Sequence, residues 1–95
     1  IGVSLRPVSL EPTALAARVR EHDFEGASLA WSLELESDPE QLWHSRWAAG
    51  GGGNHPGLVD EEVDRGIEAV QTELDDARRA RLFHALQARI YALQP

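Results

Sequence analysis

The spacing of apolar residues divides the chain into a first part with alternating segments and a second part with helical periodicity. Residues 2–10 alternate, because Val3 and Leu5 fall on one face and Ser4 and Arg6 on the other. This pattern is typical of a strand with one buried face, and Pro7 restricts its pairing to a sheet edge. The sequence therefore predicts a first strand over residues 2–10.

The next two segments complete a familiar unit. Residues 11–23 have helical spacing, with Pro12 suited to the first helical position and Leu15 and Val19 on one face. Residues 24–33 return to alternation, with Leu29, Trp31 and Leu33 on one side. Two strands joined by a crossover helix favour a parallel, right-handed βαβ unit. The predicted fold class is accordingly α/β.

Residues 38–57 combine a helix signal with a breaker. Asp38 suits an N-cap and Pro39 a helix start, so residues 38–47 predict a short helix. Four consecutive glycines follow, and residues 50–57 are expected to form a loop.

The C-terminal part predicts a helical hairpin. Val63, Ile67, Val70 and Leu74 follow one another at steps of four, three and four residues, after a cap at Asp60. A second helix begins after Asp75, with an apolar stripe of Leu82 or Phe83, Leu86, Ile90 and Leu93. The short junction at residues 74–76 predicts antiparallel packing of the two helices.

Composition limits the classes of function. The 95 residues make one domain at most, and the net charge of −7 argues against a nucleic-acid or anionic membrane partner. The absence of cysteine excludes disulfides and thiolate chemistry. No apolar run is long enough to span a bilayer, and no signal-peptide pattern is present, so the sequence is interpreted as an excised piece of a larger protein.

Catalytic and metal-binding chemistry find little support in the sequence. His44 and His55 are eleven residues apart, a spacing that fits no usual zinc pattern, so we expect no metal site and no cofactor. Glu34 and Glu36 would point the same way along a strand, and a small metal-dependent hydrolase that uses this pair is one alternative function. No nucleophile accompanies them, so the chain is not predicted to be an enzyme.

Trp31 is the more informative residue. It lies near the end of the second predicted strand, and ligands of open α/β sheets bind beyond the carboxyl ends of strands. An aromatic ring there can cover an apolar group, while the carboxylate of Glu34 can hold a cation.

The order of these segments resembles the C-terminal lobe of family 5 extracytoplasmic solute-binding proteins, the oligopeptide-, dipeptide- and nickel-type receptors of ABC importers. The resemblance covers nearly all of the chain. The residues that carry it are Asp23, Phe24, Trp31, Asp38, Pro39, Asn54, Val63, Asp64, Arg79 or Arg81, and Phe83.

The resemblance implies a periplasmic-binding-protein-like lobe fragment, with residues 1–95 as one partial domain of a larger two-lobed receptor. It implies capture of peptides or similar small solutes for ABC permease subunits, in the periplasm or at the outer face of the membrane. Trp31, Ser32 and Glu34 are the ligand-binding residues that it indicates. The glutamate stands where aspartate is usual, and one extra residue precedes Asp38.

Two further expectations follow from the length of the chain. A lone pair of strands leaves free edges and apolar surface, so the fragment is expected to self-associate. A purely structural module built on the helical hairpin is the other alternative function.

Overall fold

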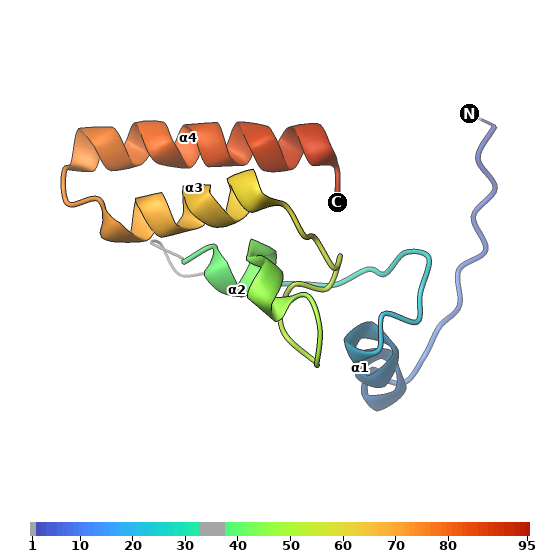
Figure 1. The fold of residues 1–95 in the computed structure, drawn as a ribbon. Coiled ribbons are helices and arrows are strands. Elements are labelled where there is room, and N and C mark those ends of the chain that lie inside the picture. Colours follow the sequence, from blue (N-terminus) through green and yellow to red (C-terminus); the bar gives the residue numbers. More distant parts are fainter. Residues whose placement is uncertain (1, 33–37) are drawn as a thin grey trace.

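The computed structural model describes residues 2–32 and 38–95, and in these residues the chain forms helices and no β-strand. Figure 1 shows α3 and α4 side by side, with α2 against α3 and α1 apart from the hairpin. The elements in order are α1 (Pro12–Arg20), α2 (Glu40–Trp43), the 3₁₀ helix η1 (Ser45–Trp47), α3 (Glu61–Thr72) and α4 (Asp76–Leu93).

The predicted α/β fold with a βαβ unit is therefore wrong. Residues 2–10 and 24–32 are free of strand pairing, and no backbone hydrogen bond joins these two segments. A strand is stable only when its N–H and C=O groups pair with a neighbouring strand, and the two segments run apart in Figure 1. Without a sheet, the predicted periplasmic-binding-protein-like arrangement is wrong as well. Residue 33, the last residue of the second predicted strand, lies outside the described residues.

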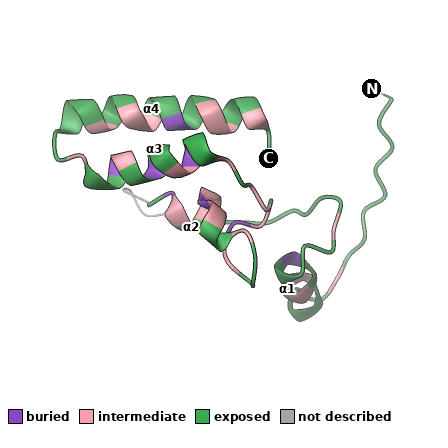
Figure 2. Ribbon diagram, in the orientation of Figure 1, coloured by how far each residue is buried: buried purple, intermediate pink, exposed green. Residues whose placement is uncertain are grey.

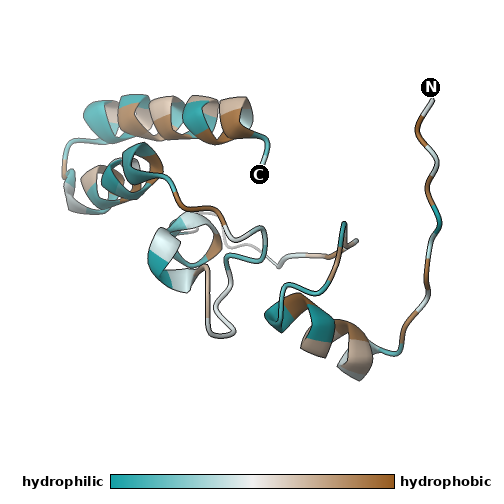
Figure 3. Cartoon of the chain, turned by 45° about the vertical axis from the view of Figure 1, so that its right-hand side comes forward, coloured by the Kyte–Doolittle hydropathy of each residue, from teal (hydrophilic) through white to brown (hydrophobic). Residues whose placement is uncertain are grey.

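The apolar residues that alternate with polar ones in the first segment are nevertheless exposed at the surface. Figure 3 shows apolar and polar residues alternating along the extended segment that precedes α1. Val3, Leu5 and Val8 are 77%, 84% and 69% exposed. These side chains are apolar surface that the described residues leave uncovered.

The predicted helix between the two segments is confirmed as α1. Pro12 occupies its first turn, and Val19 is its one buried residue. The helix ends at Arg20, and His22 then adopts a left-handed conformation with φ of 55°. That turn carries the chain into residues 24–32.

The segment 38–47 is helical, as predicted, but in two pieces. The Asp38 carboxylate accepts the backbone N–H of Glu40 at 2.9 Å, at the start of α2. His44 is extended, with ψ of 138°, and separates α2 from η1. The predicted continuous helix therefore breaks at His44.

The helical hairpin is confirmed together with both of its caps. Asp60 accepts the N–H of Val63 and Asp75 accepts that of Arg78, each at 3.0 Å. Val63, Ile67 and Val70 from α3 are buried, together with Leu86 from α4. Figure 2 shows buried positions on both α3 and α4.

Leu74 does not belong to this core, although the spacing predicts it there. Helix α3 ends at Thr72, so Leu74 lies in the connection to α4 and is 93% exposed. Partly buried side chains complete the core instead: Trp43, Leu58, Leu82, Phe83, Ile90 and Leu93.

Among the helices of residues 2–32 and 38–95, none is long and apolar enough to cross a membrane.

An ion pair ties the end of α4 to the start of α3. Nη2 of Arg89 donates to Oδ2 of Asp60 at 2.7 Å, and Nε donates to Oδ1 at 3.2 Å. These hydrogen bonds hold the pKa of Asp60 below its ordinary value and raise the pKa of Arg89. One carboxylate thus caps α3 and binds α4.

Replacement of Ile67 with alanine should lower the free energy of unfolding by about 2–4 kcal/mol, because the removed atoms leave a cavity in a fully buried site. Chemical denaturation monitored by circular dichroism measures this loss. Leu74→Ala is the matched control, and its effect should stay within about 0.5 kcal/mol because Leu74 is exposed. Equal effects of the two substitutions would contradict the described core.

Acid should weaken the contact between Asp60 and Arg89. Because the folded pKa of Asp60 lies below its unfolded value, ionised Asp60 stabilises the fold above the unfolded pKa, and this contribution is lost as pH falls through the folded pKa. Asp60→Asn keeps a capping side chain but removes the charge. Its melting temperature should be lower than that of the wild type at neutral pH and converge with it in acid.

The control for this measurement is Asp75→Asn, which changes a cap that accepts a backbone N–H but pairs with no arginine side chain among the described residues. Its melting temperature should differ less from that of the wild type at neutral pH. A neutral-pH melting temperature of Asp60→Asn equal to that of the wild type would rule out a stabilising ion pair.

Candidate functional site

Two of the three ligand-binding residues predicted from the sequence, Trp31 and Ser32, lie at the end of the first described range. Trp31 is 51% exposed, and Ser32 beside it is also exposed. Glu34, and Glu36 of the predicted carboxylate pair, lie outside the described residues. Trp31 and Ser32 are therefore the predicted site residues whose surroundings can be analysed.

Trp31 is held by a residue from the glycine-rich loop. Its indole stacks on the imidazole of His55, with ring centroids 5.3 Å apart and ring planes inclined by 18°. We call Trp31 and His55 the aromatic pair. Stacked aromatic rings stabilise one another beyond the area they bury, so the pair gives the indole a defined orientation.

A second histidine joins the aromatic pair from the end of α1. Nδ1 of His22 donates to the carbonyl oxygen of His55 at 2.9 Å. The ring of His22 also lies against Gly57, 3.9 Å from the position that a Cβ there would occupy. Residues 22, 31 and 55 thus converge, although they are far apart in the sequence.

Asn54 fixes the loop that carries His55. Its side chain is fully buried, and its Nδ2 donates to the carbonyls of His44 at 3.1 Å and Leu58 at 2.9 Å. Its Oδ1 accepts the N–H of Leu58 at 3.0 Å. Every polar atom of the buried amide has a partner, which favours a single path for the loop.

Two glycines permit the close approach that this path requires. A Cβ on Gly52 would lie 2.3 Å from the carbonyl oxygen of Trp47, and one on Gly53 would lie 2.8 Å from that of Gln41. Both distances are too short for a side chain. The expectation of a loop at residues 50–57 is confirmed, but at Gly52 and Gly53 the glycines serve close packing against the backbone.

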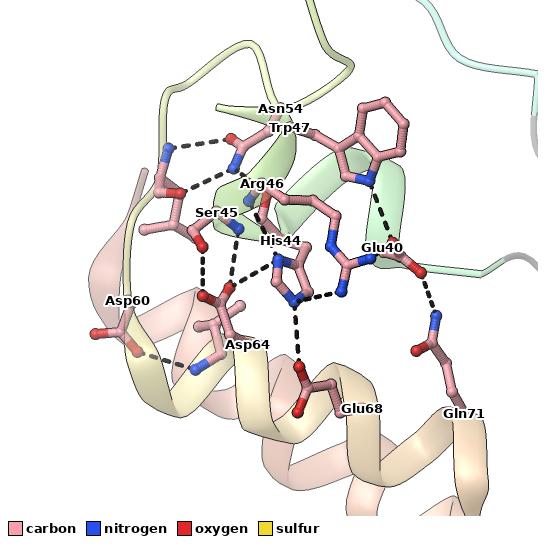
Figure 4. A network of polar contacts seen from close by, with 12 residues as sticks. Glu40, His44, Ser45, Arg46, Trp47, Asn54, Asp60, Asp64, Glu68 and Gln71 are labelled. Atoms are coloured by element: carbon pink, nitrogen blue, oxygen red, sulfur yellow. Dashed lines mark hydrogen bonds and ion pairs between the residues drawn. The ribbon is translucent and has the colours of Figure 1, made fainter. Parts of the chain in front are cut away.

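A polar network connects the same loop region to α3 (Figure 4). The carboxylate of Asp64 accepts the N–H of Ser45 at 2.9 Å and its hydroxyl at 2.5 Å. His44 is buried beside it, with Nδ1 accepting the N–H of Arg46 at 3.2 Å and Nε2 at 3.6 Å from Glu68. Asp64 therefore holds the start of η1 against α3.

The chemistry of this network is not that of a nucleophilic triad. In a catalytic triad the serine donates to the histidine, and the aspartate orients the opposite side of the imidazole. Here the Ser45 hydroxyl donates directly to Asp64. In residues 2–32 and 38–95, no group of three or more histidine or acidic side chains is arranged to hold a metal ion.

A second set of contacts joins α2 to α3 at the far end of the network (Figure 4). Nε2 of Gln71 donates to Glu40 at 2.6 Å and to Asp38 at 3.0 Å. The hydrogen bond from Gln71, with a further one from Trp47, holds the pKa of Glu40 below its ordinary value. These hydrogen bonds hold the start of α2 against α3.

Sequence reasoning missed the role of His55. The sequence places His55 in the glycine-rich loop and assigns it no ligand role, because its spacing from His44 fits no usual zinc pattern. The one sequence signal that could have indicated an ordered loop is Asn54, directly after the glycines. The partner of His55 is 24 positions away, and no local pattern identifies it.

Comparison of the chain with protein families, with curated proteins and with solved structures finds no match.

Gly52→Ala should lower the free energy of unfolding by about 1–3 kcal/mol, because the new methyl group would overlap the carbonyl of Trp47 and displace the loop. Thermal melting by circular dichroism measures the change. Gly26→Ala is the control, since a Cβ there meets nothing within 4 Å. A melting temperature of Gly52→Ala equal to that of the control would show that the loop is not closely packed.

Proposed function

We propose that the chain is part of a solute-binding receptor that captures peptides or similar small solutes for an ABC importer, in the periplasm or at the outer face of the membrane. The proposal rests on the resemblance of its motifs to family 5 solute-binding proteins and on the surroundings of Trp31. Capture of a solute needs a shaped contact surface and no bond-breaking step, so the proposal requires no catalytic group.

The observation that carries the proposal is the half-exposed indole of Trp31. Other large apolar side chains of the described residues are also exposed, but the ring of Trp31 is at the same time held by a stack on a residue far away in the sequence. Trp31 is 51% exposed yet stacked on His55, so it is oriented without being covered. Tryptophan is also among the residues that contribute most to binding energy when a partner covers them.

The motif residues of the resemblance supply the frame for this surface. Pro39, Asn54 and Val63 are buried, and the carboxylate of Asp64 binds Ser45. Each of these four residues has a structural role within residues 38–95. A binding residue functions best when such a rigid frame supports it, because less freedom is lost when the ligand arrives.

The remaining contacts are assigned by chemistry. Ser32, the next residue along the chain, would offer a hydroxyl, and the resemblance implies that the carboxylate of Glu34 would bind the amino terminus of a peptide. The net charge of −7 agrees with a cationic group on the ligand. The partners of the complete protein are the solute and the permease subunits, and the exposed apolar residues of the first segment favour self-association of the isolated chain.

Trp31→Ala should weaken solute binding by about 1–3 kcal/mol, with little change in melting temperature, because the side chain is half-exposed. Isothermal titration of the complete gene product with the tripeptides Ala-Phe-Ala and Ala-Ala-Ala measures the affinity. Tyr91→Ala is the control, an aromatic residue on α4 that is 77% exposed and outside the aromatic pair.

Two outcomes of this titration would contradict the proposal. If the wild-type gene product binds neither tripeptide, it is not a receptor for short peptides. If Trp31→Ala unfolds the protein, the indole is part of the core and not a contact for solute.

A further inference from the structure

His55 has a ring position that its hydrogen bonds do not explain. Nδ1 of the imidazole is buried and has no hydrogen-bond partner among the described residues. The contact that places the ring is its stack on Trp31, at a centroid distance of 5.3 Å. Stacking orients the plane of the imidazole without a hydrogen bond to the ring nitrogen.

The backbone of His55 is fixed from both sides of the stack. Its N–H donates to the carbonyl of Gly53 at 2.9 Å, and its carbonyl accepts Nδ1 of His22 at 2.9 Å. The residue before it is the buried Asn54. The imidazole therefore belongs to a turn whose backbone is held by hydrogen bonds. Trp31, in contrast, belongs to a segment without secondary structure.

This difference in support determines which of the two rings orients the other. In a stacked pair, the ring on the rigid turn determines the orientation of the ring on the less supported segment. The imidazole lies over one face of the indole, and Trp31 is still 51% exposed, which leaves the opposite face as the place where the stack could be extended. A flat side chain of a ligand could lie on that face and extend the stack.

We propose that His55 is a positioning residue for Trp31, and that the indole it orients receives an aromatic side chain of the bound peptide. This inference rests on the proposed function and adds to it the class of side chain that the site prefers. His55 makes no contact with the solute. It lowers the conformational freedom that Trp31 would otherwise lose when the solute binds.

The stack can be tested without any ligand by proton NMR. The indole ring current should move the imidazole C–H resonances of His55 upfield, and Trp31→Leu should return them towards their ordinary positions. The chain has four histidines, so the His55 signals are assigned by their absence in His55→Phe. His55 resonances that are unchanged in Trp31→Leu would overturn the proposal, whatever the protein binds.

The binding role is tested by titrating the complete gene product with Ala-Phe-Ala and Ala-Ala-Ala. His55→Ala should weaken binding of Ala-Phe-Ala by about fivefold or more, and binding of Ala-Ala-Ala by less. His55→Phe keeps a flat ring and should restore the affinity for Ala-Phe-Ala to within about twofold of the wild type. The same melting temperature in both variants excludes a general loss of folding.

His84→Ala is the matched control, because His84 is an exposed histidine on α4. It should change neither affinity. Equal losses for the two peptides in His55→Ala, or no rescue by His55→Phe, would overturn the positioning role while leaving peptide capture intact. Failure of the wild type to bind either peptide would overturn the proposed function and the binding role of His55 together, and the NMR result would still report whether the stack exists.

Discussion

The path of the loop between η1 and α3 depends on the burial of one amide side chain. Asn54 has no solvent contact, and its three hydrogen bonds reach His44 on one side and Leu58 on the other. A buried amide that loses its partners costs about 1–3 kcal/mol, so a different loop path would be penalised strongly. The chain between η1 and α3 is thereby fixed, and with it the position of His55 in the aromatic pair.

The helical hairpin could be predicted because its determinants are local. The spacing of Val63, Ile67 and Val70 defines one face, and the acidic caps Asp60 and Asp75 mark the first turns. The prediction failed only at Leu74, where the chain had already left α3. Residue spacing identifies the apolar face of a helix more accurately than it identifies where the helix ends.

The predicted strands and the candidate site depend on contacts that residue order does not encode. Alternation in residues 2–10 and 24–32 indicates which side chains could share a face, but a strand also needs a pairing partner, and the described residues provide none. Trp31, predicted as a ligand-binding residue, is half-exposed, and its role in binding stays a prediction. Its support by His55 could not be predicted, because stacking between distant loop residues leaves no periodic signal.

The link between residues 2–32 and residues 38–95 has a consequence for how the protein opens. Among the described residues, one hydrogen bond joins these two parts, from His22 to His55, and the stack of the aromatic pair accompanies it. The hairpin is instead held by a buried apolar core. Protein segments with few buried contacts open at lower free energy than the core does. Residues 2–32 should therefore separate from residues 38–95 at a lower free energy than α3 and α4 unfold. The aromatic pair is then a contact whose breaking releases the N-terminal segment from the helical hairpin.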